Sequence, residues 1–426
     1  MIKKLLALFL TFTLSQVVQA STIVNEIAEQ YVQLALAVGE HDKNYIDAYY
    51  GPKEWREAAN KNQISLTTVI KAGKIILSEL VKQKASDELS ALRLAYLNIQ
   101  INSLISRATM LNNNIQYEFD KEAELLYNTV PPKKALSEFE PILKKLNQLL
   151  PGKAPLAERV AQFKESYEIP TEKLERVFEA AIKECRERTK KYINLLENEN
   201  FSLEYVTDKP WSGYNWYQGN GQSLIQLNTE LPVDISRAVD LGCHEGYPGH
   251  HTYNGLLEEN LFHKQGWVEF SVYPLFSPQS LIAEGSANFG IEMAFPNEEK
   301  AEFEKKILYP LAGLNPATAD KHIQVTELLS QLSYAGNEVA RLYRNGKINS
   351  DEAQSMFQKY TLMSEQKAKQ RVRFVDTYGA YVINYNWGKD LVKKWVDSGD
   401  DQSREGRWQR FSQLLSSPRL PKTLSE

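Results

Sequence analysis

Three of the six histidines in this 426-residue chain fall within eight consecutive residues. They lie in the segment His244-Glu245-Gly246-Tyr247-Pro248-Gly249-His250-His251. Neutral imidazole is a good zinc ligand, and a glutamate directly after a ligand can take a proton from a water molecule that the metal activates. Because His-Glu pairs on solvated helices seldom come in such a cluster, the segment predicts a metal site with Glu245 as the general base.

The spacing of these histidines does not suit a regular helix. In the common H-E-x-x-H arrangement, the two ligands lie one turn apart on one helical face. Here His250 is six residues beyond His244, a rotation of roughly 240° and a rise of about 9 Å, and His251 is on the same face but about 10.5 Å away. Pro248 cannot donate a hydrogen bond to the carbonyl of His244, and Gly249 tolerates unusual dihedral angles. A bulge at this pair would make His250 the second ligand, with His251 as the alternative ligand or a supporting residue.

A third protein ligand is expected further along the chain. Glu284 lies forty residues beyond His244 in a predicted helix, and small residues such as Gly285 stand beside it. Small neighbours allow two helices to approach closely around an ion. Asn288, one turn later, could orient a ligand by a hydrogen bond. The sequence therefore predicts one zinc ion per chain, held by His244, His250 and Glu284, with the fourth position open.

Several other side chains could act on a substrate at such a centre. Tyr381 and Tyr385 lie one helical turn apart, near Tyr378. A tyrosine hydroxyl could stabilise the oxyanion that forms on an attacked carbonyl, and we assign this role to Tyr385 alone, because aromatic stripes are more often core. Arg371 and Arg373 could bind a substrate carboxylate through two parallel hydrogen bonds, although helix arginines more often face solvent.

The chain around the cluster has mainly helical spacing. Amphipathic segments span residues 23–40, 65–82, 89–111, 134–150, 171–197 and 382–396. Between residues 211 and 228 the pattern changes: residues 219–221 predict a turn and residues 223–228 a short strand. The sequence therefore predicts a mainly α fold, a multi-helical body with a small β-hairpin or edge strand next to the metal-site helix.

The predicted strand has two interpretations of equal weight. As an edge strand it could pair with an extended peptide, with Asn228 at its end as a substrate-binding residue. As a simple hairpin it would only cover the helical body. Both readings place it immediately before the metal-site helix.

The N-terminus has the pattern of a secretory signal peptide. Lys3 and Lys4 precede an apolar run over residues 5–14, and residues 18–20 supply a cleavage site after Ala20. The run is too short for a permanent membrane span. We predict a signal peptide at 1–20, an N-terminal helical scaffold at 21–200 and a helical catalytic region with the zinc site at 201–426. The mature protein would be periplasmic or secreted.

The composition limits the kinds of partner that the protein is expected to bind. A net charge of −4, a pI near 6.0 and the absence of a basic run argue against nucleic-acid binding. No later segment is apolar enough for stable membrane insertion, and the sequence leaves the oligomeric state open. Cys185 and Cys243 are the only cysteines. Two cysteines form no disulfide framework, so two free, buried thiols are expected, with a single bridge as the alternative.

The histidine-rich segment resembles the H-E-x-x-P-G-H-H signature of domain of unknown function 885, a family of predicted zinc metallopeptidases. Three further segments are similar to the family's Glu-Gly-Trp-Ala, Tyr-x-x-Gly and Gly-rich strand motifs: Glu284-Gly285-Ser286-Ala287, Tyr385-Asn386-Trp387-Gly388 and residues 219–228. The resemblance spans about half the chain, from Trp211 to near Val396. It implies a helical, gluzincin-like site made of the His-Glu motif and a distal glutamate. Ser286 departs from the family's Trp.

Together these features predict a zinc-dependent hydrolase. The expected activity is that of a metallopeptidase that cleaves peptide amide bonds with water, with Glu245 as the base. One alternative is a metal-dependent amidase that acts on a non-peptide or peptidoglycan substrate. The other is a non-catalytic, exported metal-binding protein, which a fourth protein ligand such as His251 would favour.

Overall fold

The computed structural model describes residues 2–296 and 298–424, with side chains from residue 22 onward within these ranges. The mainly α fold predicted from the sequence is confirmed. The first helices are α1 (Ile2–His41), α2 (Lys53–Asn62), α3 (Leu66–Leu80), α4 (Glu88–Asn113), α5 (Phe119–Tyr127), α6 (Glu140–Leu149), α7 (Leu156–Glu165) and α8 (Leu174–Thr189). The later ones include α9 (Arg237–Leu241), α10 (His250–Leu257), α11 (Pro278–Ala294), α14 (Ala319–Ser330), α15 (Ser333–Arg344), α16 (Ser350–Thr361), α17 (Glu365–Tyr378), α18 (Ile383–Asp397) and α19 (Arg404–Leu415).

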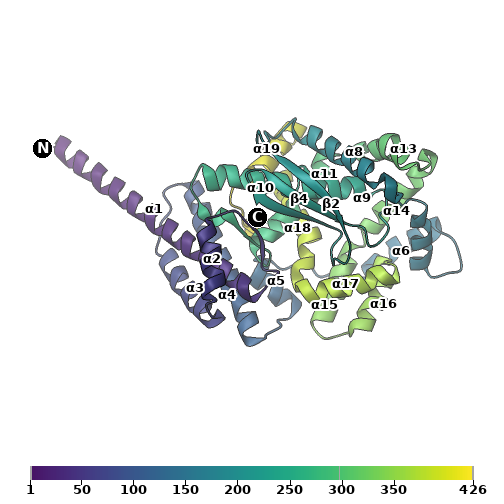
Figure 1. The fold of residues 1–426 in the computed structure, drawn as a ribbon, viewed down its shortest axis with the longest axis horizontal. Helices are drawn as coiled ribbons and strands as arrows, with labels where there is room; N and C mark the ends of the chain where they lie inside the picture. Colours follow the sequence, from purple (N-terminus) through teal and green to yellow (C-terminus); the bar gives the residue numbers. More distant parts are fainter. Residues whose placement is uncertain (1, 297, 425–426) are drawn as a thin grey trace.

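Helices that are close in sequence lie together in different parts of the molecule (Figure 1). Figure 1 shows α2, α3 and α4 beside the inner part of α1, with α15, α16 and α17 together in another part of the molecule. The labels of β2, β4, α10 and α11 lie above those of α15 and α17 in this view. The largest buried core contains residues from Val24 to Leu424, so both predicted regions contribute to it. The boundary predicted at residue 200 stays a prediction.

The N-terminal signal peptide also stays a prediction. Residues 2–20 of the predicted segment form the start of α1, and Met1 lies outside the described residues. Throughout the part of the chain that the structure describes, none of the helices combines the length and apolar character that a bilayer crossing requires.

A glycine contact joins α11 and α18 at the centre of the molecule. A Cβ atom on Gly388 would lie 2.6 Å from the carbonyl oxygen of Leu281, and one on Gly285 would collide with the backbone of Gly388. Any side chain at these glycines would therefore push the helices apart. The small neighbours of Glu284 thus permit the close helix approach predicted from the sequence, and they bring Glu284 next to Tyr385 on α18.

A three-stranded sheet lies next to α10. β2 (Asn200–Val206) pairs in parallel with β4 (Gln222–Asn228), and β4 pairs antiparallel with β3 (Gly213–Gly219). The predicted turn is present, with positive φ angles of 83°, 54° and 67° at Gly219, Asn220 and Gly221. Of the two interpretations of residues 223–228, the edge strand is wrong, because β2 pairs with the other side of β4. The edge next to residues 244–251 is β3 instead.

A second, two-stranded sheet joins distant parts of the chain. β1 (Ile46–Tyr49) pairs antiparallel with β5 (Val272–Pro274), so that Ala48 lies opposite Tyr273. This pairing carries Asp47 from the N-terminal region to the segment just before α11.

The expectation of two free thiols is wrong. Cys185 on α8 and Cys243 in the π-helical turn η3 (Gly242–Gly246) form a disulfide, with their Cα atoms 5.4 Å apart. Gly242 lets the two segments approach closely, since a Cβ atom there would lie 3.2 Å from Cγ1 of Ile182 on α8. Both cysteines are fully buried in a second core that also contains Val239. The disulfide ties α8 to the residue directly before His244.

Candidate metal centre

The His-Glu segment interrupts the helix at the position that the sequence predicts. The turn η3 follows α9, the peptide bond between Tyr247 and Pro248 is cis, and α10 begins at His250. The N–H of Gly249 donates to the carbonyl oxygen of Cys243 at 3.0 Å. A Cβ atom at Gly249 would collide with the carbonyl of His244, so only glycine fits this bulge.

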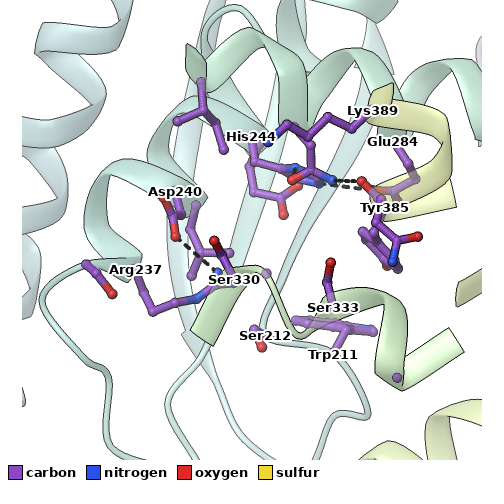
Figure 2. A pocket seen from close by; sticks show the side chains of 18 of the residues that line it. Trp211, Ser212, Arg237, Asp240, His244, Glu284, Ser330, Ser333, Tyr385 and Lys389 are labelled. Carbon is purple, nitrogen blue, oxygen red and sulfur yellow. Dashed lines mark hydrogen bonds and ion pairs between the residues drawn. The ribbon is translucent and has the colours of Figure 1, made fainter. Parts of the chain in front are cut away.

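The bulge brings the two histidines together despite their six-residue spacing. Nε2 of His244 lies 3.1 Å from Nε2 of His250. The carboxylate of Glu284, from α11, reaches both rings: Oε2 is 3.1 Å from Nε2 of His244, and Oε1 is 3.7 Å from Nε2 of His250. All three side chains are buried. Figure 2 shows His244, Glu284 and Tyr385 gathered at one point of the cavity.

These donor atoms fit a metal ion. Three ligands at tetrahedral angles with bonds of about 2.0–2.1 Å have their atoms roughly 3.3 Å apart, close to the distances found here. Oε2 of Glu284 is buried, and it makes no hydrogen bond of normal geometry within the described residues. Two facing ring nitrogens and a buried carboxylate oxygen without a hydrogen bond are the environment that a cation would satisfy.

Glu245 is a competing third ligand on geometry alone. His244, Glu245 and His250 offer ligand atoms that all lie within 4.8 Å of one another. The two glutamates differ in charge state. Burial, reinforced by the carboxylates of Glu284 and Asp47, raises the pKa of Glu245 to about 8. Burial acts on Glu284 in the same direction, but His250 and His244 outweigh it and hold the pKa of Glu284 below its usual value. The ionised Glu284 suits a ligand, and a carboxyl group whose pKa lies near neutral pH, as that of Glu245 does, can both take up and return a proton.

Hydrogen bonds from neighbouring helices orient the candidate ligands. Nδ1 of His244 lies 3.2 Å from Oδ1 of Asn288, whose Nδ2 donates to the carbonyl of Tyr385 at 3.1 Å. The hydroxyl of Tyr381 donates to Oε1 of Glu284 at 2.7 Å. Asn288 therefore lies where an orienting residue was predicted. The role of Tyr381 was missed, and its only signal was the one-turn spacing from Tyr385.

Tyr385 lies against the candidate ligands. Its ring centroid is 6.4 Å from that of His244, and the side chain lines the cavity. Burial, reinforced by the Glu284 carboxylate, raises the pKa of Tyr385 well above its ordinary value, so the hydroxyl keeps its proton and can donate a hydrogen bond.

His251 points away from this group. Its Nδ1 lies 2.7 Å from Oγ of Ser223, and its Nε2 lies 3.0 Å from Oε2 of Glu199. Tyr247 donates to the same carboxylate oxygen, and Arg186 forms an ion pair with Glu199. Both ring nitrogens of His251 therefore have protein partners, and the residue lies where a supporting role was expected.

The candidate centre opens into a cavity of about 1240 Å³. Asp47, on β1, lines this cavity, and one of its carboxylate oxygens accepts a hydrogen bond from the hydroxyl of Tyr214. Burial raises the pKa of Asp47 to about 6. The sequence carried no sign of this carboxylate, because Asp47 precedes the histidine cluster by almost 200 residues and reaches it only through the pairing of β1 with β5.

Of the three candidate substrate-binding residues, Asn228 and Arg371 line the cavity and Arg373 does not. The Asn228 amide lines the cavity and donates at 2.9 Å to the carbonyl oxygens of Lys209 and Trp211, so it fastens the loop before β3. Arg371 also lines the cavity, whereas Arg373 is exposed.

Comparisons with known proteins concern the fold. No family model matches the chain, and no curated protein matches it. A protein described as a lipoprotein from Colwellia psychrerythraea has 14% identity and a TM-score of 0.53, over 86% of this chain and 70% of that one. BsuCP has 12% identity and a TM-score of 0.45 over 93% and 88% of the chains. A Pyrococcus furiosus carboxypeptidase has 13% identity and a TM-score of 0.42 over 95% and 94%. The first likeness shows a shared fold.

Proposed function

We propose that this chain is a zinc-dependent hydrolase, a metallopeptidase that cleaves peptide amide bonds. The observation that carries the proposal is the convergence of His244, His250 and Glu284 beside Glu245 in the wall of the cavity. Three nitrogen and oxygen ligands with an open fourth position form the usual catalytic zinc site. His251 is engaged with Ser223 and Glu199, so it is not expected to close that position.

The residues around the centre have complementary roles in amide hydrolysis. Zinc bound there would polarise a carbonyl group and lower the pKa of water. Glu245 takes a proton from the water that attacks the carbonyl carbon, and it returns the proton to the nitrogen as the C–N bond breaks. The Tyr385 hydroxyl donates a hydrogen bond to the oxygen that becomes negatively charged. Asn215 donates to the backbone oxygen of Glu245 at 2.6 Å and fixes this segment.

The position of the edge strand β3 favours a peptide as the substrate. Within the described residues, β3 pairs only with β4, so its other edge has no strand partner. Gly213, at the start of β3, is so close to the centre that a Cβ atom there would lie 2.8 Å from Oε1 of Glu245. An extended peptide that paired with this edge would pass directly beside Glu245. A non-peptide amide or a peptidoglycan fragment would not need such an edge.

The first test is the metal content of the purified mature protein, measured by elemental analysis after dialysis. About one zinc per chain is expected, together with cleavage of a mixed peptide library that stops when a chelator removes the metal and resumes when zinc is returned. A chain that binds no divalent metal even after supplementation would overturn the proposal. Metal binding without turnover on peptides or other amides would favour a non-catalytic metal-binding protein.

We also propose that the protein is exported to the periplasm or secreted after removal of residues 1–20. The support is the basic, apolar and small-residue pattern of the N-terminus. N-terminal sequencing of the protein recovered outside the cytoplasm should begin at Ser21. An intact Met1 on the exported protein, or retention in the cytoplasm, would contradict this part of the proposal.

A further inference from the structure

Helix α17 places two basic side chains in the cavity wall, and neither forms an ion pair within the described residues. Lys367 and Arg371 are four residues apart, so they share one face of the helix, and both line the cavity. Within the described residues, neither the Lys367 ammonium nor the Arg371 guanidinium forms a hydrogen bond or an ion pair. The guanidinium of Arg371 only stacks over Phe374, with Cζ 5.4 Å from the ring centroid. Lys367 is exposed and Arg371 is half-buried. A partly buried guanidinium is normally paired, so Arg371 is the cation of this wall that lacks a carboxylate partner within the described residues.

A third cation from α9 strengthens the positive charge of this wall. Arg237 lines the same cavity and lies 3.5 Å from Asp240. That carboxylate is bound more closely by Lys300, at 2.5 Å. Burial, together with the nearby charge of Arg237, lowers the pKa of Arg371. Asp240 balances Arg237, and Asp234 and Glu168 act electrostatically on Lys367. Within the described residues no carboxylate pairs with Arg371, so a ligand that supplies this anion is the simplest reason for its place in the cavity wall.

The basic wall lies on one side of the candidate centre. The Arg371 guanidinium stacks over the Phe374 ring, whose centroid is 6.2 Å from that of Tyr385. The Tyr385 centroid is in turn 6.4 Å from that of His244. A negative charge lies near the other candidate ligands, because the Asp47 carboxylate interacts electrostatically with His250 and Glu284. A substrate with a negative end would therefore be oriented with that end toward α17.

We propose that Arg371, assisted by the positive field of Arg237 and Lys367, binds the terminal carboxylate of the peptide substrate, so that the cavity acts on the C-terminal ends of chains. A planar guanidinium matches a carboxylate through two parallel hydrogen bonds, and the Phe374 ring holds the guanidinium plane in place. This inference rests on the proposed peptidase function and specifies its substrate class. Only a short C-terminal segment would lie between the cleaved bond and Arg371.

The experiment compares matched peptides that differ only in a free C-terminal carboxylate or a carboxamide. For the zinc-loaded protein we expect kcat/KM for the acid to exceed that for the amide by about 10- to 100-fold, the usual range for a charge-assisted interaction. Arg371→Gln should lower kcat/KM for the acid by about 10- to 100-fold and so abolish its advantage over the amide. Arg371→Lys should recover part of the preference. Arg373→Gln, an exposed change on the same helix, should leave both substrates unchanged.

A binding measurement gives a readout that does not depend on turnover. In the background of Glu245→Gln, the same acid and amide peptides are titrated by calorimetry. The acid should bind about 10- to 100-fold more tightly, and Arg371→Gln added to this background should remove the difference. Circular dichroism of each variant checks that the fold is retained, with Arg371→Lys as the second variant if Arg371→Gln does not fold.

The outcomes separate this inference from the proposed function. Equal cleavage and equal binding of acid and amide would overturn it while the peptidase proposal stands. An equal loss on both substrates in Arg371→Gln would assign the residue a structural role and would also overturn it. A zinc-loaded protein that cleaves and binds no peptide would overturn both proposals.

Discussion

Two adjacent histidines, His250 and His251, belong to groups that differ in how fully their polar atoms are paired. The open group comprises His244, His250, Glu284 and Glu245, and the closed group comprises His251, Ser223, Glu199, Tyr247 and Arg186. In the closed group both imidazole nitrogens have protein partners. In the open group two imidazole nitrogens face each other, and Oε2 of Glu284 has no hydrogen bond within the described residues. His250 and His251 are thus joined by one peptide bond, but the group of His250 has polar atoms free to bind a ligand, whereas the ring nitrogens of His251 are already paired within the protein.

The closed group supports the open one through short chain connections. Arg186 is directly preceded by Cys185, and His244 by Cys243, and the disulfide between the two cysteines links the groups. Tyr247 lies between the candidate ligands in sequence and is hydrogen-bonded to Glu199. A buried, fully paired network is rigid, so it can hold an incompletely paired neighbour in place. Changes in the open group should therefore affect metal and turnover, and changes in the closed group should affect stability.

The largest expected contrast is between His250→Ala and His251→Ala. His250→Ala should lose the metal and reduce turnover by about 10³-fold or more, because the metal supplies several kcal/mol of transition-state stabilisation. His251→Ala should keep the metal and lower the free energy of unfolding by about 1–3 kcal/mol, since Glu199 and Ser223 lose a buried partner. Elemental analysis and urea unfolding measure the two effects. Loss of metal from His251→Ala with full retention in His250→Ala would reverse the assignment.

The next contrast lies within the open group. Glu245→Gln should keep one zinc per chain and reduce kcat by about 10²- to 10⁴-fold, because the amide cannot accept the proton of the attacking water. The control is Glu259→Gln, at a partly exposed glutamate in the turn after α10 that pairs with Lys264, and it should leave kcat unchanged. If Glu245→Gln released the metal, Glu245 rather than Glu284 would be the third ligand.

The open group was largely predictable because its chemistry is local. Pro248 and Gly249 cannot continue a regular helix, so the sequence itself indicates the bulge that turns His250 toward His244. Glu284 followed from its place forty residues after His244, its small neighbours and the family resemblance, and Asn288 followed from its one-turn spacing from Glu284. The cavity walls were not predictable in the same way, because Asp47 reaches the centre only through a strand pairing between distant segments.

The closed group was hidden from the sequence because its partners are distant. Glu199 lies 52 residues before His251, and Cys185 lies 58 residues before Cys243. Neither separation has a periodicity that predicts contact. The same reason explains the wrong edge strand: β4 is interior because β2 pairs with it in parallel, and a parallel pairing leaves no local turn signal.

Removal of the disulfide should have a smaller effect, and it should change the stability of the fold without abolishing zinc binding. Replacing both Cys185 and Cys243 by serine should lower the free energy of unfolding by about 2–4 kcal/mol, because the reduced chain gains conformational freedom when it unfolds. At low temperature the variant should still bind zinc. Thermal unfolding with and without reductant measures the loss, and the variant should no longer respond to reductant. A reductant effect that persists in the variant would show that the bridge is not its source.

The smallest effect is a pH dependence that belongs to the closed group alone. Burial favours the neutral form of Glu199, but its hydrogen bonds from His251 and Tyr247 and its ion pair with Arg186 outweigh burial and lower its pKa below 4.5. A carboxyl group whose pKa is lowered in the folded state stabilises the protein above its unfolded pKa, and this contribution is lost as the pH falls through the folded pKa. The difference in the free energy of unfolding between the wild-type protein and Glu199→Gln should therefore be largest near pH 6, at about 1–2 kcal/mol, and should shrink toward pH 3.

Urea titrations at four pH values between 6 and 3 test this dependence. Glu187→Gln is the matched control, since Glu187 is an exposed glutamate on α8 that also lies beside Arg186. Its difference from the wild-type protein should stay within about 0.5 kcal/mol at every pH, as for ordinary surface substitutions. At neutral pH both variants should keep their zinc, because neither changes a candidate ligand. A Glu199→Gln difference that stayed constant with pH would mean that packing, and not the charge of Glu199, holds the closed group together.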